Sequence, residues 1–185
     1  MPDPVNFSDF IVDLLQIKEK EIKTIALKRY EYLTRAGDVE RHLYWVESGA
    51  LRAIYLSAEE EHSIRFGYAG SLINALPSYF SAQPSELYVQ ALRETVVKAI
   101  PRHTILSYVE SDADRGRSYR LLLELLAVQQ NERELDLLTS SPMQRLQRVM
   151  QRSPKVFQEI PAKYIASYLR MTPETLSRLR KELNS

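Results

Sequence analysis

Residue types that read DNA gather near the end of the sequence, between positions 172 and 181. Glu174, Thr175, Ser177, Arg178 and Lys181 carry the carboxylate, hydroxyl and cationic groups that proteins use to contact base edges and phosphates. On a helix, side chains three and four positions apart share one side, so most of these groups would point the same way. This pattern predicts recognition of double-stranded DNA and no covalent chemistry.

Two short helices joined by a tight turn are the elements expected to hold these side chains. Residues 162–181 place apolar side chains at helical spacing on both sides of Arg170. Thr172 can cap the second helix with its hydroxyl, and Pro173 suits the first helical position. Arg170 stands where such turns usually have glycine, so we expect a left-handed conformation that costs about 1 kcal/mol. The residues predicted to be buried are Ile165, Ala166, Leu169, Leu176 and Leu179. An ordinary helix pair in an all-α core is the alternative.

The charge distribution supports a nucleic-acid partner for this end of the chain. Residues 141–185 hold nine Lys/Arg and three acidic residues, a net charge of +6, although the whole chain carries only +1. Residues 1–140 hold sixteen Lys/Arg and twenty-one acidic residues, a net charge of −5. A basic segment attached to an acidic body fits binding to phosphates, although a solvated basic helix would have a similar composition.

The other reactive residue types form no recognisable catalytic or metal-binding motif. The sequence has no cysteine, and its three histidines, His42, His62 and His103, lack the spacing of metal ligands. We therefore predict a protein that is not an enzyme and has no metal or other cofactor. A metalloenzyme in which these distant histidines converge in space is the alternative.

Composition and hydropathy indicate a globular protein that is not embedded in a membrane. Hydrophobic residues make up 44% of the chain and charged residues 26%, which is ordinary for a globular protein. No apolar run approaches the roughly 20 residues that span a bilayer. The first ten residues lack the basic and apolar pattern of a secretion signal. We expect a cytoplasmic protein with no membrane partner.

Residues 21–102 indicate short strands, because β-branched and aromatic residues alternate there with turn signals. The segments expected to form strands are 22–27, 30–33, 42–47, 51–56, 62–66, 87–92 and 95–100. Ser48-Gly49 predicts a hairpin between the third and fourth of these segments, and the last two segments predict a second hairpin. Many short strands separated by turns favour a small β-roll or barrel.

A long helix is expected from Asp112 or Asp114 to about Leu138, with two apolar stripes. One stripe holds Leu121, Leu125, Val128 and Leu135, and the other holds Leu122 and Leu126. Two stripes suggest two burial surfaces, one on the roll and one on a second copy of the chain. The residues predicted to line the dimer helix are Leu121, Leu122, Leu125 and Val128. Burial of the helix by its own domain alone is the alternative.

This order of parts resembles the Crp/Fnr family of bacterial transcription regulators. The segment YIASYLRMTPETLSRLRKEL at 164–183 is similar to the family's helix-turn-helix pattern, and LYWVESGAL at 43–51 is similar to its strand-and-turn pattern. The resemblance implies an α+β fold. It would comprise an N-terminal cyclic-nucleotide-binding-like β-roll (jelly-roll), a long connecting dimerisation helix and a C-terminal winged-helix-like helix-turn-helix domain. We expect the final wing to be truncated, because the sequence ends at Ser185.

The resemblance also implies a division of the chain and a set of DNA contacts. The expected parts are a sensor roll at 1–111, the connecting helix at 112–140 and the DNA-binding domain at 141–185. Glu174, Thr175 and Arg178 match residues that contact base edges, whereas Ser177 and Lys181 would lie beside the backbone of the DNA. The full predicted DNA-binding set is Thr172, Pro173, Glu174, Thr175, Ser177, Arg178 and Lys181.

The sensor half departs from the pattern of members that bind cyclic nucleotides. Those members hold the ribose with a glutamate and the phosphate with an arginine, and the corresponding positions here lack both residues. Ser85 or Glu86 stands in place of the arginine, so we expect that cAMP and cGMP do not bind in the usual way. The candidate residues for a pocket that binds another small effector of unknown identity are Gly70, Ser71, Leu72, Ser85 and Glu86.

The sequence therefore predicts a homodimeric, DNA-binding transcription regulator that senses an unidentified effector through its roll. Double-stranded DNA, a second copy of the chain and RNA polymerase are the candidate partners. The alternative is an effector-binding or protein-interaction module that has lost DNA binding. Salt dependence separates the two, because DNA binding weakens steeply as ionic strength rises.

Overall fold

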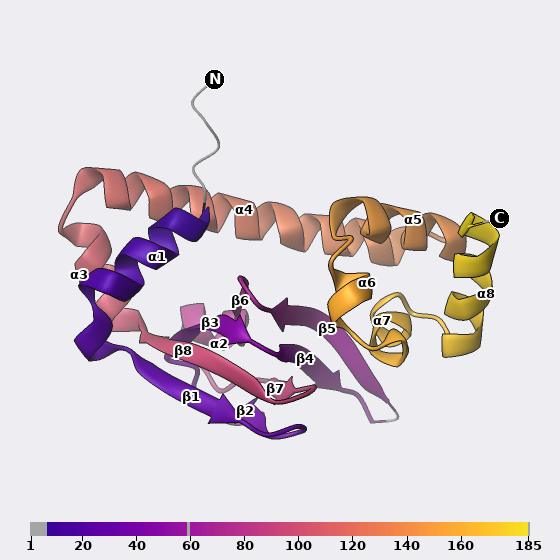
Figure 1. Ribbon diagram of the computed structural model, residues 1–185, viewed down its shortest axis with the longest axis horizontal. Coiled ribbons are helices and arrows are strands. Elements are labelled where there is room, and N and C mark those ends of the chain that lie inside the picture. Colours follow the sequence, from indigo (N-terminus) through magenta and orange to yellow (C-terminus); the bar gives the residue numbers. More distant parts are fainter. Residues whose placement is uncertain (1–6, 59, 185) are drawn as a thin grey trace.

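The strands of the protein form two antiparallel sheets that face each other as a β-roll (Figure 1). The computed structural model describes residues 7–58 and 60–184. One sheet has the order β1 (Lys23–Leu27), β8 (Thr95–Pro101), β3 (His42–Ser48) and β6 (Leu72–Ile73). The other has the order β2 (Tyr32–Thr34), β7 (Leu87–Ala91), β4 (Ala50–Leu56) and β5 (Glu61–Tyr68). The predicted roll is confirmed.

Both hairpins expected from the sequence are wrong, because the chain changes sheet at each of these turns. β3 pairs with β8 and β6, whereas β4 pairs with β5 and β7. The turn between β3 and β4 places Gly49 at φ +91°, against the backbone and hydroxyl of Thr95, where a Cβ would clash. The Thr95 hydroxyl binds both the amide and the carbonyl of Ala50. This hydroxyl therefore links the start of β8 in one sheet to the start of β4 in the other.

The apolar side chains between the sheets form one core, and helices complete a second. The first core contains Leu27 and Val97 from one sheet and Leu51 and Val89 from the other. The second core lies where α1 (Phe7–Ile17) and α3 (Arg102–Glu110) meet the roll. A short 3-10 turn (Glu19–Glu21) follows α1, and the short helix α2 (Leu76–Ser81) follows β6.

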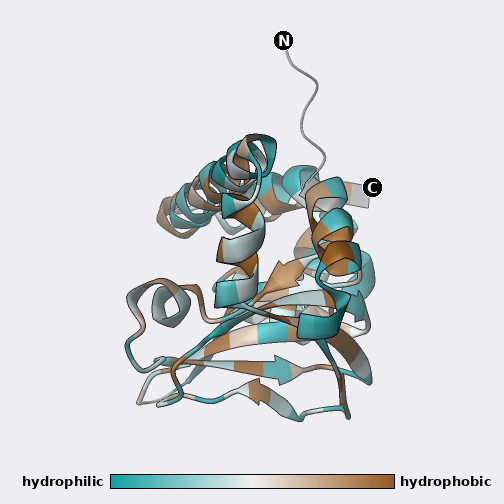
Figure 2. Ribbon diagram, turned by 90° about the vertical axis from the view of Figure 1, so that its left-hand side faces the viewer, coloured by the Kyte–Doolittle hydropathy of each residue, from teal (hydrophilic) through white to brown (hydrophobic). Residues whose placement is uncertain are grey.

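The long helix α4 (Ala113–Leu138) runs along the roll, from α3 at one end of the molecule to the C-terminal helices at the other (Figure 1). Asp112 caps it by accepting hydrogen bonds from the amides of Asp114 and Arg115. It packs on α1 and α3, and its C-terminal part packs on α5. A view from the end that carries α1 and α3 shows helices above the sheets, with hydrophobic and hydrophilic positions on both layers (Figure 2). No helix in the part of the chain that is described combines the length and apolar character needed to cross a membrane.

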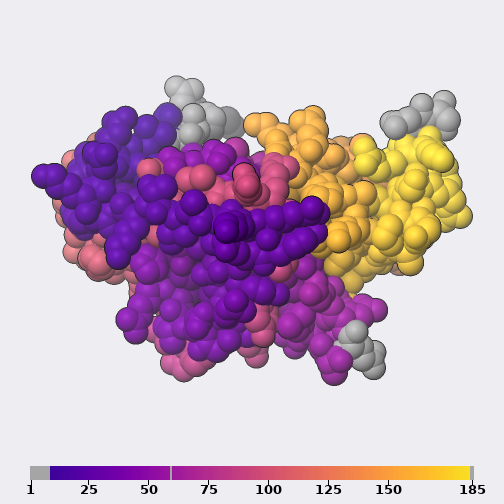
Figure 3. Space-filling model, turned by 60° about the horizontal axis from the view of Figure 1, so that its bottom comes forward, coloured from indigo at the N-terminus to yellow at the C-terminus, as the bar shows by residue number. Residues whose placement is uncertain are grey.

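The four C-terminal helices form a compact unit at one end of the molecule, beside β5 (Figures 1 and 3). They are α5 (Pro142–Arg152), α6 (Val156–Glu159), α7 (Ala162–Tyr168) and α8 (Pro173–Asn184). Their apolar side chains share one core with Ala50 and Leu92 of the roll. The unit is therefore packed directly against the sheets.

Candidate functional site

The helices α7 and α8 form the helix-turn-helix predicted from the sequence. Ile165, Ala166 and Leu169 of the first helix are fully buried. Leu176 and Leu179 of the second are 1% and 6% exposed, so the inward faces are as expected. The small side chain of Ala166 lies at the corner, where its carbonyl accepts a hydrogen bond from the amide of Met171 (3.0 Å).

The turn between the helices has the strained residue and the cap that the sequence predicts. Arg170 adopts φ +53°, in the left-handed region. The Thr172 hydroxyl accepts a hydrogen bond from the amide of Thr175 at 3.2 Å, which satisfies an otherwise unpaired group of α8. Sequence reasoning missed the support that Arg145 of α5 gives this turn. Its guanidinium donates to the carbonyls of Leu169 (2.9 Å) and Arg170 (3.3 Å).

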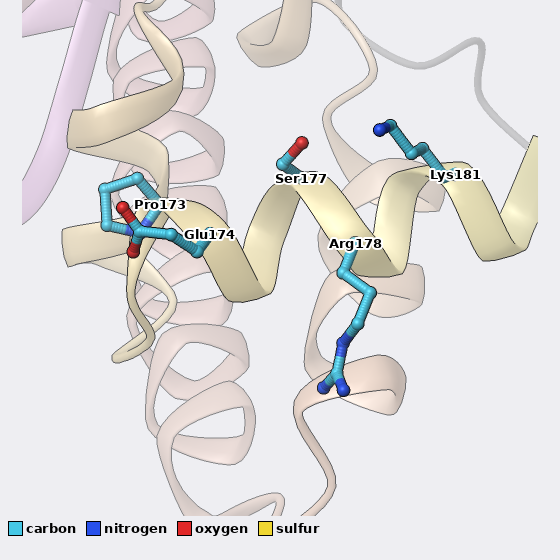
Figure 4. Close-up of a pocket in the computed structure, with 5 residues that line it drawn as sticks. All are labelled: Pro173, Glu174, Ser177, Arg178 and Lys181. Carbon is cyan, nitrogen blue, oxygen red and sulfur yellow. The ribbon is translucent and has the colours of Figure 1, made fainter.

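The outward face of α8 carries the predicted DNA-binding residues at the surface. Thr172, Pro173, Glu174, Ser177, Arg178 and Lys181 are exposed, and Thr175 is half-buried. Figure 4 shows the side chains projecting from α8 into open space, with Arg178 on one edge and Ser177 and Lys181 on the other. The Arg178 side chain is 71% exposed and lies 3.8 Å from Glu182 in an exposed pair, which contributes little to stability. These groups are available to a ligand.

The first turn of α8 carries one negative charge, on Glu174. The carboxylate of Glu174 has a lowered pKa, because its own backbone amide and then the Thr172 hydroxyl hydrogen-bond to it. Its anionic form is further favoured by the amide end of the helix. Glu174 therefore presents a charged acceptor beside the two cations, which suits an amino group on a base edge.

Part of the positive charge counted in residues 141–185 is used inside the protein. Asp136 of α4 is completely buried and forms ion pairs with Arg148 and Arg152 of α5. Both arginines also contact Glu132. These pairs fix α5 to the end of α4. The cations of this segment that remain exposed are Arg178 and Lys181 of α8, together with Lys155, Lys163 and Arg170.

The long helix has an exposed apolar stripe, as predicted, but Leu122 does not belong to it. Leu121, Leu125 and Val128 are 45%, 44% and 57% exposed. Leu122 is only 5% exposed and packs with Ile105 and the other residues of the core at α1 and α3. The prediction that Leu122 lines the dimer interface is therefore wrong. Successive residues of a helix point in different directions, and Leu122 faces the core of its own domain.

The predicted effector-pocket residues fall into two groups, and no hydrogen bond among the described residues joins them. Gly70, at φ +82°, Ser71 and Leu72 form the turn into β6. The Ser71 hydroxyl binds the amide and the carbonyl of Tyr68 at 2.8 and 2.6 Å. Leu72 is buried in the core at α1 and α3. This group closes a turn and offers no free polar side chain.

The second group lies at the loop that precedes β7. Ser85 is buried, and its hydroxyl donates to the carbonyl of Leu87 and accepts from the same residue's amide. Its own backbone pairs with Gly37 and Asp38 (both 2.8 Å). Glu86 is exposed. Ser85 therefore fastens two loops of the roll.

Glu40, which sequence reasoning missed, is the buried carboxylate of this region. It is 4% exposed and accepts hydrogen bonds from the hydroxyls of Thr34 (2.7 Å) and Tyr44 (3.2 Å) and from the amides of Arg41 and His42. Burial raises the pKa of Tyr44, and the negative charge of Glu40 raises it further. The Glu40 amide donates to Ser78 of α2. The carboxylate of Glu40 thus accepts hydrogen bonds from the two hydroxyls and two amides that surround it.

The helix-turn-helix is held on the roll by polar contacts as well as apolar ones. The Ser167 hydroxyl of α7 accepts from the amide of Ser63 in β5 (3.0 Å). The buried guanidinium of Arg52 in β4 lies 4.3 Å from the ring centroid of Tyr164 and donates to Gln90. Movement of α7 would therefore break contacts with two strands of the roll.

The described residues include no group of three or more His, Cys, Asp or Glu side chains arranged to hold a metal ion. His42, His62 and His103 lie in β3, in β5 and at the start of α3. His42 stacks on Tyr44, and His62 stacks on Tyr55. Burial lowers the pKa of His42, and the nearby His103 contributes to this shift, whereas His62 lies apart from both.

Comparisons with known proteins agree with this architecture. Residues 24–112 match the model of the cyclic nucleotide-binding domain family. Among the curated proteins, no sequence matches the chain significantly. FixK2 from Bradyrhizobium japonicum has a similar structure, with 18% identity, a TM-score of 0.71, and coverage of 88% of this chain and 84% of that one.

Two further solved structures share the arrangement. The c-di-GMP responsive global regulator CLP of Xanthomonas campestris is 14% identical, with a TM-score of 0.69, and the match covers 94% of this chain and 91% of that one. The catabolite activator protein of Thermus thermophilus is 19% identical, with a TM-score of 0.58, and the match covers 93% and 83%. At these identities the likeness shows a common fold.

Proposed function

We propose that the chain, which has the fold of the Crp/Fnr regulators and matches the cyclic nucleotide-binding domain family at residues 24–112, is a DNA-binding transcription regulator. The observation that carries the proposal is the outward face of α8. Its polar and cationic side chains are exposed while its apolar ones are buried, as a recognition helix requires. Such a regulator would act in the cytoplasm on double-stranded DNA, with RNA polymerase as a further candidate partner.

The proposal assigns a role to each predicted DNA-binding residue. Arg178 grips guanine, and Glu174 and Thr175 contact neighbouring base edges. Thr172, Ser177 and Lys181 lie along the DNA backbone, and Pro173 fixes the first turn of α8. This reading head corresponds to residues 141–185, with the sensor at 1–111 and the link at 112–140.

A titration with DNA tests this role directly. Fragments selected by binding from the source genome provide the site, and fluorescence anisotropy gives its Kd. We expect Arg178→Ala to weaken binding about 5- to 150-fold, equivalent to about 1–3 kcal/mol. The matched control is Arg117→Ala, which removes an exposed arginine of α4 that pairs with Asp114. Equal affinity of Arg178→Ala and the unsubstituted protein for the selected site would contradict the assignment.

We propose that the working unit is a homodimer formed through the exposed stripe of α4. Leu121, Leu125 and Val128 are the central residues, because apolar side chains this exposed on a long helix favour a partner helix. Two reading heads related by two-fold symmetry would then enter successive major grooves.

Sedimentation of two variants tests the dimer. Leu125→Glu places a carboxylate in the stripe, so we expect a monomer at concentrations where the unsubstituted protein is a dimer. Leu56→Glu is the control, because Leu56 is equally exposed, at 44%, but lies on the roll. A dimer that survives Leu125→Glu would refute the interface.

We propose that the roll does not bind cAMP in the usual way. The hydroxyls of Ser71 and Ser85 are bound within their own turns, and the buried carboxylate of Glu40 would repel a phosphate. Titration calorimetry is expected to show no micromolar binding of cAMP, and such binding would overturn this part of the proposal.

The alternative is a protein-interaction module that has lost DNA binding. The close docking of α7 on β5 through Ser167 favours it, because a fixed unit also makes a rigid protein-binding surface. Salt decides between the two functions. Binding to DNA should weaken about tenfold or more when salt rises from 50 to 200 mM.

A further inference from the structure

Two cationic side chains lie beside a glutamine and a tyrosine where the long helix, the roll and the helix-turn-helix meet. The group consists of Arg65 of β5, Gln129 and Arg133 of α4, and Tyr168 of α7, and is called the junction cluster below. The guanidinium carbon of Arg133 lies 3.6 Å from the ring centroid of Tyr168. Arg65 donates to the amide oxygen of Gln129 at 3.0 Å. Three parts of the fold thus converge on one small region.

Arg133 is a buried cation with an unused donor. Arg133 is only 9% exposed. Its Nη1 atom is buried and has no hydrogen-bond partner among the described residues. A buried charge without a partner is costly. The free energy lost here would be recovered if an acceptor reached Nη1.

Burial lowers the pKa of Arg133 and the nearby carboxylate of Asp136 raises it, but no ion pair among the described residues joins these two side chains. The buried Asp136 and its neighbour Glu132 form ion pairs with Arg148 and Arg152. None of the ion pairs formed by the described residues includes Arg133 or Arg65. The junction cluster therefore keeps an excess of positive charge.

The electrostatic surroundings support this conclusion. Burial lowers the pKa of both Arg65 and Arg133, and the Tyr168 phenol partly opposes the shift at both residues. Tyr168 is thus a common electrostatic neighbour of both guanidiniums, although its ring contact is with Arg133. The negative charge of Asp136 also raises the pKa of Arg133, whereas Arg170 and Arg152 lower it by smaller amounts through repulsion. Arginine stays protonated in proteins, so both guanidiniums remain charged.

We propose that the junction cluster is a binding site for a small phosphate-type oxyanion, separate from the sensor cassette. Guanidinium groups match the oxygens of such an ion with paired N–H donors. Arg133 would donate through Nη1, and Arg65 would turn from the neutral Gln129 to the ion. Gln129 is exposed, so the edge of the cluster faces solvent. The bound ion would fasten α4 to β5 and α7.

Thermal unfolding of the full chain tests the site without DNA, so its outcome is independent of the proposed regulator function. The probe is inorganic phosphate at pH 7, compared with chloride and acetate at equal ionic strength. At about ten times its Kd, we expect phosphate to raise Tm by about 3–5 °C more than either salt. A rise no larger than in chloride or acetate would overturn the proposal.

Three variants locate the effect. Arg133→Met should abolish the phosphate response and leave Tm in chloride unchanged or higher, because it removes an unpaired buried charge. Arg65→Gln, at a half-buried position, should reduce the response and serves if Arg133→Met does not fold. Arg117→Gln, an exposed arginine of the same helix, should respond like the unsubstituted protein. An undiminished phosphate response in Arg65→Gln or Arg133→Met would refute the site.

Discussion

The outward face of α8 and the cassette region of the β-roll are both polar, but their polar groups have different partners. On α8, Arg178 and Lys181 project from the surface, and Arg178 makes only a weak, exposed ion pair with Glu182. In the roll, Ser71, Ser85 and Glu40 make hydrogen bonds within the chain that fix turns and strands. The polar residues of the roll are therefore structural, whereas the polar residues on the outward face of α8 are available for binding.

Removing the carboxylate of Glu40 should have the largest effect on stability. Glu40→Ala leaves the donors on Thr34, Tyr44 and two amides without their acceptor, so we expect the free energy of unfolding to fall by about 2–4 kcal/mol. Urea denaturation measures the change. The control is Glu86→Ala at an exposed position, and its loss should stay within about 0.5 kcal/mol. Equal losses in the two variants would erase the distinction drawn for the roll.

The cap of α8 should have a smaller effect. Thr172→Ala removes the acceptor for the amide of Thr175, so we expect a loss of about 1 kcal/mol in the free energy of unfolding. Thr172→Ser keeps a hydroxyl and should retain most of the stability. If the serine variant were as unstable as the alanine variant, the hydroxyl would not be the cause. This pair separates residues that build α8 from those that its surface presents.

Arg178→Ala should have the smallest effect on stability. The side chain is 71% exposed, so we expect the free energy of unfolding to change by no more than about 0.5 kcal/mol. Urea denaturation of this variant, set beside its DNA titration, shows whether the two properties separate. A loss of several kcal/mol would place Arg178 in the structural class with Glu40.

Local sequence patterns predicted the elements well, because their signals lie within a few residues. The helix-turn-helix followed from apolar spacing, the Thr172 cap and the left-handed Arg170, and the structure has all three. The long helix likewise ends at Leu138, as expected. These features depend on backbone preferences and side-chain periodicity, which each segment carries alone.

Contacts between distant segments were not predictable in the same way. The turn at Gly49 looked like a hairpin, but pairing with β8 and β7 sends the two flanking strands into different sheets. Leu122 was expected at a dimer interface, yet the core at α1 and α3 covers it. No local signal marked Glu40 as a buried acceptor, because its partners are brought together by folding.

The sequence by itself determined where helices and strands form and which side of α8 faces outward, since both depend on residue type and spacing over short distances. The tertiary structure decided which polar residues are free. It bound Ser71, Ser85 and Glu40 within the roll and left Arg133 buried with an unused donor. The physical reason is that a polar group's availability depends on every acceptor and donor that folding brings near it.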